Sequence, residues 1–170
     1  MRDLGSINPI IVTVWKITLD VILIFVGNQK ETVGFSAYST MTRSYNSNEI
    51  VIFDELNSNF GQYFDVDSNT FVCPYDGIYW FSVSCYNDVG HACTPSLMVE
   101  NQLLVQTIAP EDSESRNSAS IATVAECKAG QRALVKNLGN NRTYNDSWDR
   151  TNTFSGYLLH VGLNTTNSVA

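Results

Sequence analysis

The chain has 170 residues, of which 44% are hydrophobic and 11% aromatic, and its formal net charge at pH 7 is −7. This length fits one domain with a sizeable core, and the hydrophobic content excludes disorder for most of the chain. The negative charge argues against a nucleic-acid-binding protein, because phosphate contacts need a basic face.

The first 32 residues form an atypical N-terminal segment. Residues 10–26 read IIVTVWKITLDVILIFV, which is short for a membrane span and is interrupted by Lys16 and Asp20. The segment is either a degenerate secretion signal or membrane anchor, or an irregular extension of the fold, since period-2 alternation around Ile17 and Leu19 also suits a strand. Membrane contact is expected only if residues 10–26 act as an anchor.

Short strand-like runs separated by polar turns fill residues 33–162. The runs are 33–38, 50–53, 62–66, 70–73, 78–86, 96–101, 103–108, 118–127, 132–138 and 153–161. Many short strands without an amphipathic helix predict an all-β sandwich or barrel. Residues 163–170 are expected to be a flexible tail.

Alternation within the strands predicts which faces are buried. In residues 78–86 the side chains of Tyr79, Phe81 and Val83 point to one side and are expected in the core. The last strand, 153–161, carries large apolar groups on both faces. Such a strand needs cover on both sides, which indicates either a subunit interface against its outer face or a central position under a long loop.

The sequence offers little catalytic or metal-binding chemistry. It lacks a nucleophile elbow, a phosphate loop and a dinucleotide fingerprint, and neither His91 nor His160 has a patterned catalytic partner. We therefore expect no enzyme. Asp146 and Asp149 are calcium candidates because calcium prefers oxygen ligands from turns, although aspartate is also an ordinary turn residue. Calcium is the one cofactor that remains possible.

Cysteines and sequons suggest an oxidising, extracellular setting. The four cysteines lack the two-residue spacing of zinc or redox motifs, and their even number suits disulfides, although buried free thiols fit equally. Three Asn-x-Ser/Thr sequons are candidate glycosylation sites, at Asn141, Asn145 and Asn164.

A spaced series of residues in the centre of the chain resembles the globular-head domain of complement C1q, in the C1q and tumour-necrosis-factor superfamily. The series is Phe53, five residues, Asn59, four residues, Phe64, six residues, Phe71, five residues, Gly77, then Tyr79 and Phe81. The next aromatic of the family pattern is replaced by Val83. The flanking stretches VGFSAY at 33–38 and TFSGYLL at 153–159 resemble the opening and closing strands, so the resemblance spans a whole domain.

The resemblance implies a ten-stranded jelly-roll β-sandwich that is secreted and forms a homotrimer. Its candidate interface residues here are Phe35, Tyr38, Phe154, Leu158 and His160. Gly77 is expected to adopt a backbone angle forbidden to other residues, so that Gly77→Val misfolds the domain.

Cysteine pairing is then expected to follow the hairpins. Cys85 and Cys93 flank the loop YNDVGHA and are expected to bridge the strands on either side of it. Cys73 and Cys127 remain, either paired or free.

The expected function is a secreted, non-enzymatic recognition module of the innate-immunity type, which binds glycan, microbial-surface or protein ligands through loops and gains avidity by trimerisation. The alternative is a signalling ligand similar to tumour necrosis factor or cerebellin, anchored to a membrane if residues 10–26 serve that purpose.

Overall fold

The computed structural model describes residues 31–146 and 149–162. The chain divides into two units, Met1–Glu31 and Thr32–Ala170, and the fold below is that of the second. The predicted N-terminal segment, apart from its last residues, and the tail 163–170 lie outside the described residues. Within the described ranges, no helix is long and apolar enough to cross a membrane.

Twelve strands make up the described fold. They are β1 (Gly34–Tyr38), β2 (Arg43–Tyr45), β3 (Glu55–Phe60), β4 (Phe64–Asp65), β5 (Thr70–Val72), β6 (Gly77–Tyr86), β7 (Pro95–Val99), β8 (Gln102–Gln106), β9 (Ser118–Cys127), β10 (Arg132–Asn137), β11 (Asn141–Thr143) and β12 (Thr153–Val161).

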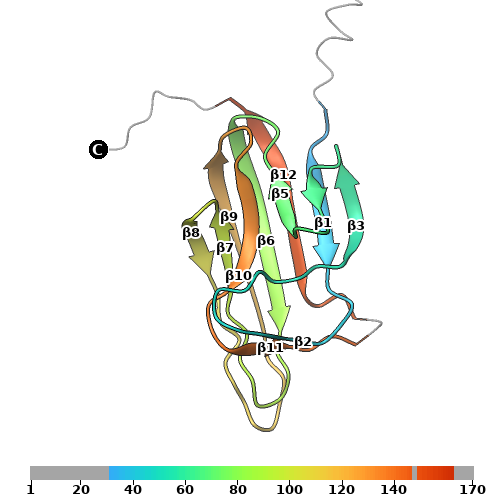
Figure 1. Cartoon of the computed structure of the whole chain (residues 1–170), viewed down its shortest axis with the longest axis vertical. Coiled ribbons are helices and arrows are strands. Elements are labelled where there is room, and N and C mark those ends of the chain that lie inside the picture. Colours follow the sequence, from blue (N-terminus) through green and yellow to red (C-terminus); the bar gives the residue numbers. More distant parts are fainter. Residues whose placement is uncertain (1–30, 147–148, 163–170) are drawn as a thin grey trace, which may run out of the picture. The chain divides into compact units, whose positions relative to one another are not determined.

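Ten of these strands form two five-stranded antiparallel sheets that pack face to face (Figure 1). We call the sheet with strand order β3-β1-β12-β6-β9 sheet I, and the sheet with order β4-β5-β10-β7-β8 sheet II. The remaining strands, β2 and β11, pair with each other across one end of the sandwich. The predicted all-β sandwich is confirmed.

Aromatic side chains from both sheets fill the core. Along β6 the buried and partly exposed residues alternate, and Tyr79, Phe81 and Val83 are almost fully buried, as the sequence predicted. Phe35 of sheet I stacks on Phe71 of sheet II with ring centroids 4.8 Å apart. Burying each such ring contributes roughly 2–3 kcal/mol, so these rings are a main source of sandwich stability.

Asn59 and Gly77 fulfil structural roles. The Asn59 amide nitrogen donates to the Phe64 carbonyl at 2.9 Å, and its Oδ1 accepts from the Phe64 amide at 3.1 Å, which closes the turn between β3 and β4. Gly77 does not have a positive φ, so the predicted backbone reason is wrong. The constraint is space: a Cβ on Gly77 would lie 2.4 Å from the His160 carbonyl oxygen on β12.

The sequence misplaced some of the strands. Residues 50–53 were expected as a strand, but they lie in a loop that buries Val51 and Phe53. The strand follows at β3, whose sequence ELNSNF is mostly polar because it is the edge of sheet I. The short strands β2 and β11 were not expected.

Candidate functional site

Four long loops gather at one end of the sandwich (Figure 1), opposite the end where Gly77 of β6 pairs with Val161 of β12. We call this the loop end, formed by residues 39–54, 87–94, 107–117, 138–146 and 149–152. Loops held by a rigid scaffold carry binding residues more often than strands do. The loop end is therefore the first candidate for a ligand site.

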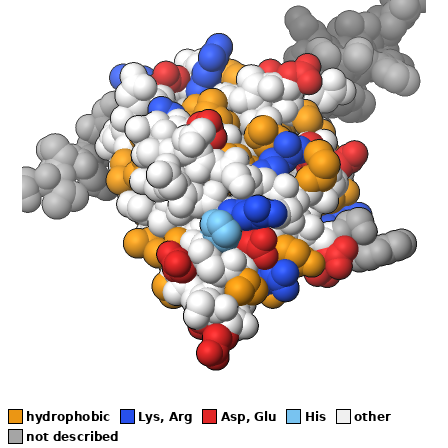
Figure 2. All heavy atoms as spheres, turned by 60° about the horizontal axis from the view of Figure 1, so that its bottom comes forward, with side chains coloured by type: hydrophobic (Ala, Val, Ile, Leu, Met, Phe, Trp, Pro, Cys, Tyr) orange, Lys and Arg blue, Asp and Glu red, His pale blue; other side chains and the backbone are white. Residues whose placement is uncertain are grey.

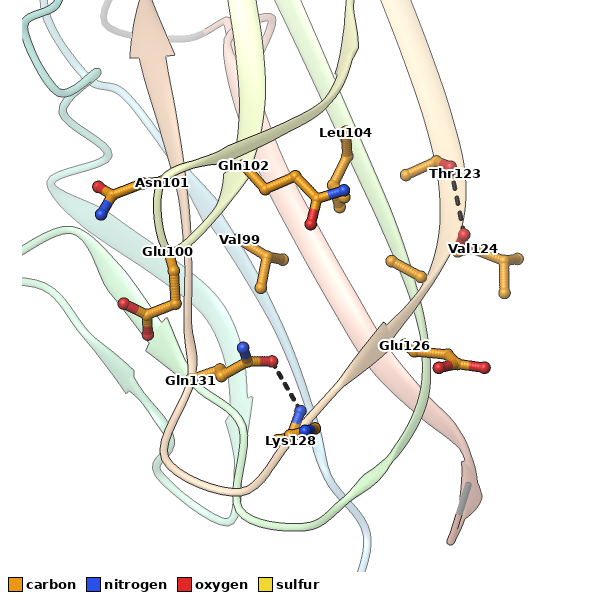
Figure 3. A pocket seen from close by; sticks show the side chains of 11 residues that line it. Val99, Glu100, Asn101, Gln102, Leu104, Thr123, Val124, Glu126, Lys128 and Gln131 are labelled. Atoms are coloured by element: carbon orange, nitrogen blue, oxygen red, sulfur yellow. Dashed lines mark hydrogen bonds between the residues drawn. The ribbon is translucent and has the colours of Figure 1, made fainter. Parts of the chain in front are cut away.

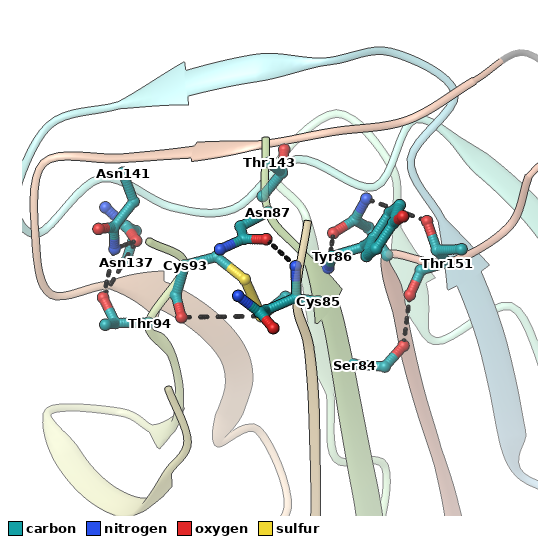
Figure 4. Close-up of a disulfide and its surroundings, with 12 residues drawn as sticks. Ser84, Cys85, Tyr86, Asn87, Cys93, Thr94, Asn137, Asn141, Thr143 and Thr151 are labelled. Carbon is teal, nitrogen blue, oxygen red and sulfur yellow. Dashed lines mark hydrogen bonds between the residues drawn. A yellow bond between two sulfur atoms is a disulfide. The ribbon is translucent and has the colours of Figure 1, made fainter. Parts of the chain in front are cut away.

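A disulfide fixes one of these loops. Cys85, near the end of β6, bonds to Cys93, just before β7, with their Cα atoms 6.5 Å apart (Figure 4). The bond closes the loop that carries His91, and it packs with Ala109 from the β8–β9 loop in a small buried cluster. The predicted Cys85–Cys93 pairing agrees with this geometry.

Buried asparagines tie the loops to one another. Asn87, which is fully buried, donates from its amide nitrogen to the carbonyls of His91 at 2.6 Å and Pro110 at 2.7 Å. Asn152 donates to the Tyr144 carbonyl at 2.6 Å and accepts from the Tyr86 amide at 2.9 Å. Each buried amide that lost these partners would incur a desolvation cost, so the loop end has a defined shape.

The same network buries two of the predicted glycosylation sites. Asn141 and Asn145 are 6% and 7% exposed. The side-chain amide of Asn141 contacts Thr94 and Asn137, and the amide nitrogen of Asn145 donates to the Ser39 carbonyl. A glycan on the Asn145 amide nitrogen would break its bond to Ser39, and a glycan on Asn141 would need room beside a buried side chain of the folded domain. Asn164 lies outside the described residues.

Two adjoining depressions lie beside β2 at the loop end. The first, which we call the β2 hollow, has a volume of about 340 Å³ and is lined by Ser44, Tyr45, Asn46, His91, Asn140 and Asn141. The second has a volume of about 530 Å³, shares Ser44 and Tyr45 with it, and is also lined by Arg43, Glu49, Ile50 and Ile52. Hydrogen-bonding side chains from separate loops thus converge on one small region.

The charged side chains of the loop end are largely paired with one another. Figure 2 shows cationic, anionic and histidine side chains close together on this end. Asp88 lies between two guanidinium groups, 3.3 Å from Arg116 and 3.1 Å from Arg142. Arg116 also stacks on the Tyr144 ring, with its guanidinium carbon 3.6 Å from the ring centroid. This cluster braces the loops, and its two guanidinium groups share a single carboxylate.

Asp54 forms an ion pair with Arg43, which lines the second depression. Burial opposes ionisation of its carboxyl group, but hydrogen bonds from Arg43 and Thr40 outweigh burial, so the pKa of Asp54 is lowered. The Arg43–Asp54 ion pair has an N–O distance of 2.8 Å. Arg43 is therefore already paired where it lines the depression.

A third and larger hollow lies at the side of the sandwich, between the edge strands β8 and β9 (Figure 3). It has a volume of about 780 Å³, and amide and carboxylate side chains such as Asn101, Gln102 and Glu126 line it. Its polar groups are partly used internally, since the Glu100 carboxylate accepts from the Arg132 amide at 2.8 Å. The sequence pattern had not indicated this hollow.

The outer face of sheet I carries an apolar row. The register places Phe60, Gly34, Tyr157, Trp80 and Val124 side by side across all five strands. Phe60, Tyr157 and Val124 are 57%, 46% and 56% exposed, and the Trp80 and Tyr157 rings are 5.3 Å apart. The next row toward the loop end consists of Ser58, Ser36, Ser155, Ser82 and Ala122. This face is uncharged along both rows.

Two of the five predicted interface residues are misplaced. Phe35 and Phe154 are 4% and 0% exposed and face the core, where their rings contact each other at 4.8 Å. Leu158 is half-buried and packs against that core. The β-bulge after Leu158 shifts the register, so that exposed His160 pairs with Ile78.

Tyr38 is half-buried on the outer face of sheet I, under the Arg150 guanidinium at 4.5 Å. Of the predicted interface set, Tyr38 and His160 are accessible to a partner, and the apolar row supplies the larger accessible surface.

The two calcium candidates are joined by a backbone hydrogen bond. The Asp149 amide donates to the Asp146 carbonyl at 2.9 Å. Among the described residues, no group of three or more histidine, cysteine, aspartate or glutamate side chains could hold a metal ion. Calcium binding at Asp146 and Asp149 stays a prediction.

Cys73 and Cys127 are free thiols, both buried in the main core. The corner that begins at Cys73 lies against the β9–β10 turn, because the Cys73 amide donates to the Gln131 carbonyl at 2.9 Å. Interaction with the Cys127 thiol, together with burial, raises the pKa of Cys73. A thiol in this environment is a poor nucleophile.

Comparison with known proteins agrees with this architecture. The model of the C1q domain family matches residues 34–159. The globular domain of zebrafish complement 1qA superimposes with a TM-score of 0.64 at 14% identity, covering 78% of this chain and all of that one. Murine APRIL gives 0.61 at 17% identity, covering 76% of this chain and all of that one. Eiger, a TNF protein from S. frugiperda, gives 0.61 at 14% identity, covering 82% of this chain and all of that one.

Proposed function

Because the chain belongs to the C1q domain family, we propose that it is a secreted homotrimeric recognition module that binds glycan, microbial-surface or protein ligands through its loop end. The family is non-catalytic and its domains typically trimerise. A C1q domain with a disulfide is typical of an extracellular protein. For this chain, trimer formation and the class of ligand are proposals.

The observation that carries the proposal is the outer face of sheet I. A row of four large apolar side chains without charge is a surface that favours burial against another protein. Association of three copies through such faces would bury Trp80 and Tyr157. It would leave other surfaces, including the loop end, to meet a ligand.

Trimerisation would give avidity. Three copies of one weak site, held at fixed separation, bind a repetitive surface far more tightly than one site does. Microbial and cellular glycans are repetitive surfaces of this kind. The net charge of −7 disfavours nucleic acids and other polyanions as ligands, unless calcium bridges the like charges.

The test is a binding screen of the purified full chain against immobilised polysaccharides and whole bacteria, with calcium or with a chelator. We expect saturable binding to at least one polysaccharide or bacterial surface. If calcium bridges the contact through Asp146 and Asp149, the chelator and Asp149→Asn abolish binding alike. Saturable binding to a single cell-surface receptor, with no binding to any microbial or polysaccharide surface, would contradict microbial and glycan recognition.

A signalling ligand is the second candidate. It is supported by the similarity in fold to the TNF protein Eiger and to APRIL. The same preparation distinguishes the two functions, because a signalling ligand would bind one receptor on cells and remain indifferent to free saccharides.

A further inference from the structure

The β2 hollow brings together hydrogen-bonding groups that the fold leaves unused. Ser44 comes from β2, His91 from the disulfide loop and Asn140 from the turn between β10 and β11. All three residues are exposed. Among the interactions within the described residues, the Ser44 hydroxyl, the Asn140 amide and the His91 Nε2 have no partner.

We propose that the β2 hollow binds one ring of a neutral, polyhydroxylated ligand, such as a hexose unit of a surface glycan, through Ser44, His91 and Asn140. The inference rests on the proposed recognition function and assigns it a site and a ligand chemistry.

The tautomer of His91 sets part of the hydrogen-bond pattern. Its Nδ1 lies 3.0 Å from the Val89 carbonyl oxygen. A carbonyl oxygen only accepts, so Nδ1 carries the hydrogen and neutral His91 presents Nε2 as an acceptor. Ser44 both donates and accepts, and the Asn140 amide does so through two different atoms. Adjacent sugar hydroxyls, each a donor and an acceptor, match such a mixture.

The side chains that line the two depressions favour a neutral ligand. The β2 hollow contains no lysine, arginine, aspartate or glutamate. In the neighbouring depression Arg43 is paired with Asp54, and both carboxylate oxygens of Glu49 accept from Asn46 at 2.8 Å. A sulfate or phosphate group would find no unpaired cation there. Ile50, 39% exposed in that depression, offers an apolar surface to the carbons of a second ring.

The groups around the hollow are held in place before a ligand arrives. The His91 carbonyl accepts from Asn87 at 2.6 Å, and the His91 amide donates to the Asp88 carbonyl at 3.1 Å. On the other side, the Asn48 amide donates to the Asn137 carbonyl at 2.7 Å. A rigid site loses less entropy on binding, which suits a small ligand with few contacts. The volume of about 340 Å³ is at the lower end for ligand sites and suits one ring.

The experiment uses the full chain on immobilised mannan, galactan and chitin, with mannose, galactose and N-acetylglucosamine as free competitors. We expect one polysaccharide to bind and its own monosaccharide to compete. Asn140→Ala and His91→Ala should each weaken binding about tenfold, since each removes one desolvated hydrogen bond. Ser44→Phe fills the hollow and should abolish binding.

Asn101→Ala is the matched control. It removes an exposed asparagine from the hollow between β8 and β9, and binding should be unchanged. Circular dichroism and molar mass verify that each variant folds and assembles as the wild type does.

Three outcomes would overturn the proposal. If the wild-type protein binds a polysaccharide and Ser44→Phe binds it equally well, the site lies elsewhere. The same conclusion follows if Asn101→Ala loses binding. In both cases the recognition function stands. Binding of a protein or peptide with no saccharide bound refutes the ligand chemistry but keeps recognition. No saturable binding to any saccharide, bacterium or protein removes the proposed function together with its site.

Discussion

Gly77 begins β6 and lies beside the end of β12, and adding one methyl group there tests how tightly the two strands pack. The Cβ of Gly77→Ala would stand 2.4 Å from the His160 carbonyl oxygen and 2.9 Å from a Leu158 methyl carbon. Since Cβ contacts under 3.0 Å are essentially never seen, the two strands must separate by about 0.6 Å. The obstacle is backbone, so no rotamer change relieves it.

The expected cost follows from this displacement. Overpacking with a backbone shift costs about 1–3 kcal/mol, and weakening one ladder hydrogen bond between β6 and β12 adds about 1 kcal/mol. We expect Gly77→Ala to lower the free energy of unfolding by about 2–4 kcal/mol, a large part of the roughly 5–15 kcal/mol typical of a domain. Gly77→Val should fail to fold.

Urea unfolding followed by circular dichroism, at one fixed protein concentration, measures the change. Gly90→Ala is the control, because Gly90 has a φ of +73° and no atom lies within 4 Å of the position that its Cβ would occupy. The control therefore incurs only backbone strain of about 1–2 kcal/mol. A loss at Gly77 smaller than the loss at Gly90 would refute the steric explanation.

Three further predictions concern the loops and the core. Replacing Cys85 and Cys93 together by alanine removes the disulfide, which joins residues eight positions apart in the sequence. The free energy of unfolding should fall by about 2.5 kcal/mol. An unchanged urea midpoint would show that the disulfide does not stabilise the domain. The Cys73 thiol, with its raised pKa, should resist iodoacetamide at pH 8 in the native protein and react only after unfolding, and rapid native labelling by mass spectrometry would contradict its burial. The pKa of Asp54 is lowered from 3.8 in the folded state, so its contribution is present above that pH and is lost as the pH falls through the folded pKa. Asp54→Asn should therefore destabilise the domain at pH 7, and the loss relative to wild type should shrink as the pH falls below 3.8. A loss that stays constant throughout acidification would exclude this linkage.

The fold was largely predictable because its core positions carry a spaced aromatic pattern. Phe53, Phe64, Phe71, Tyr79 and Phe81 are all at most 3% exposed, so the spacing reflects packing between the two sheets. The strand at 50–53 was predicted wrongly for the same reason, since burial of Val51 and Phe53 in a loop produces the same alternation as a strand. Edge strand β3 was not predicted, because its sequence ELNSNF is mostly polar and lacks the regular alternation of apolar and polar residues that marks a half-buried strand.

The candidate site was less predictable because it is assembled from distant segments. His91 was singled out as a loop residue, but its proximity to Ser44 and Asn140 depends on how β2 and β11 cross the loop end. Which face of β12 points inward also required the structure, and this placed Phe154 in the core and Tyr157 outside. The sequons at Asn141 and Asn145 match the glycosylation motif, but the sequence does not reveal that both side chains are buried in hydrogen-bonding contacts with other loops.

The measurement that tests the central claim most directly is the molar mass of the full chain by light scattering at micromolar concentration, together with that of Trp80→Lys. If the outer face of sheet I is buried between three copies, the wild-type protein should have three times the chain mass of 18.9 kDa. A charge at Trp80 should leave a folded monomer, since the row that it disrupts faces solvent in the single chain. A wild-type monomer, or a Trp80→Lys variant that stays trimeric, would contradict assembly through this face.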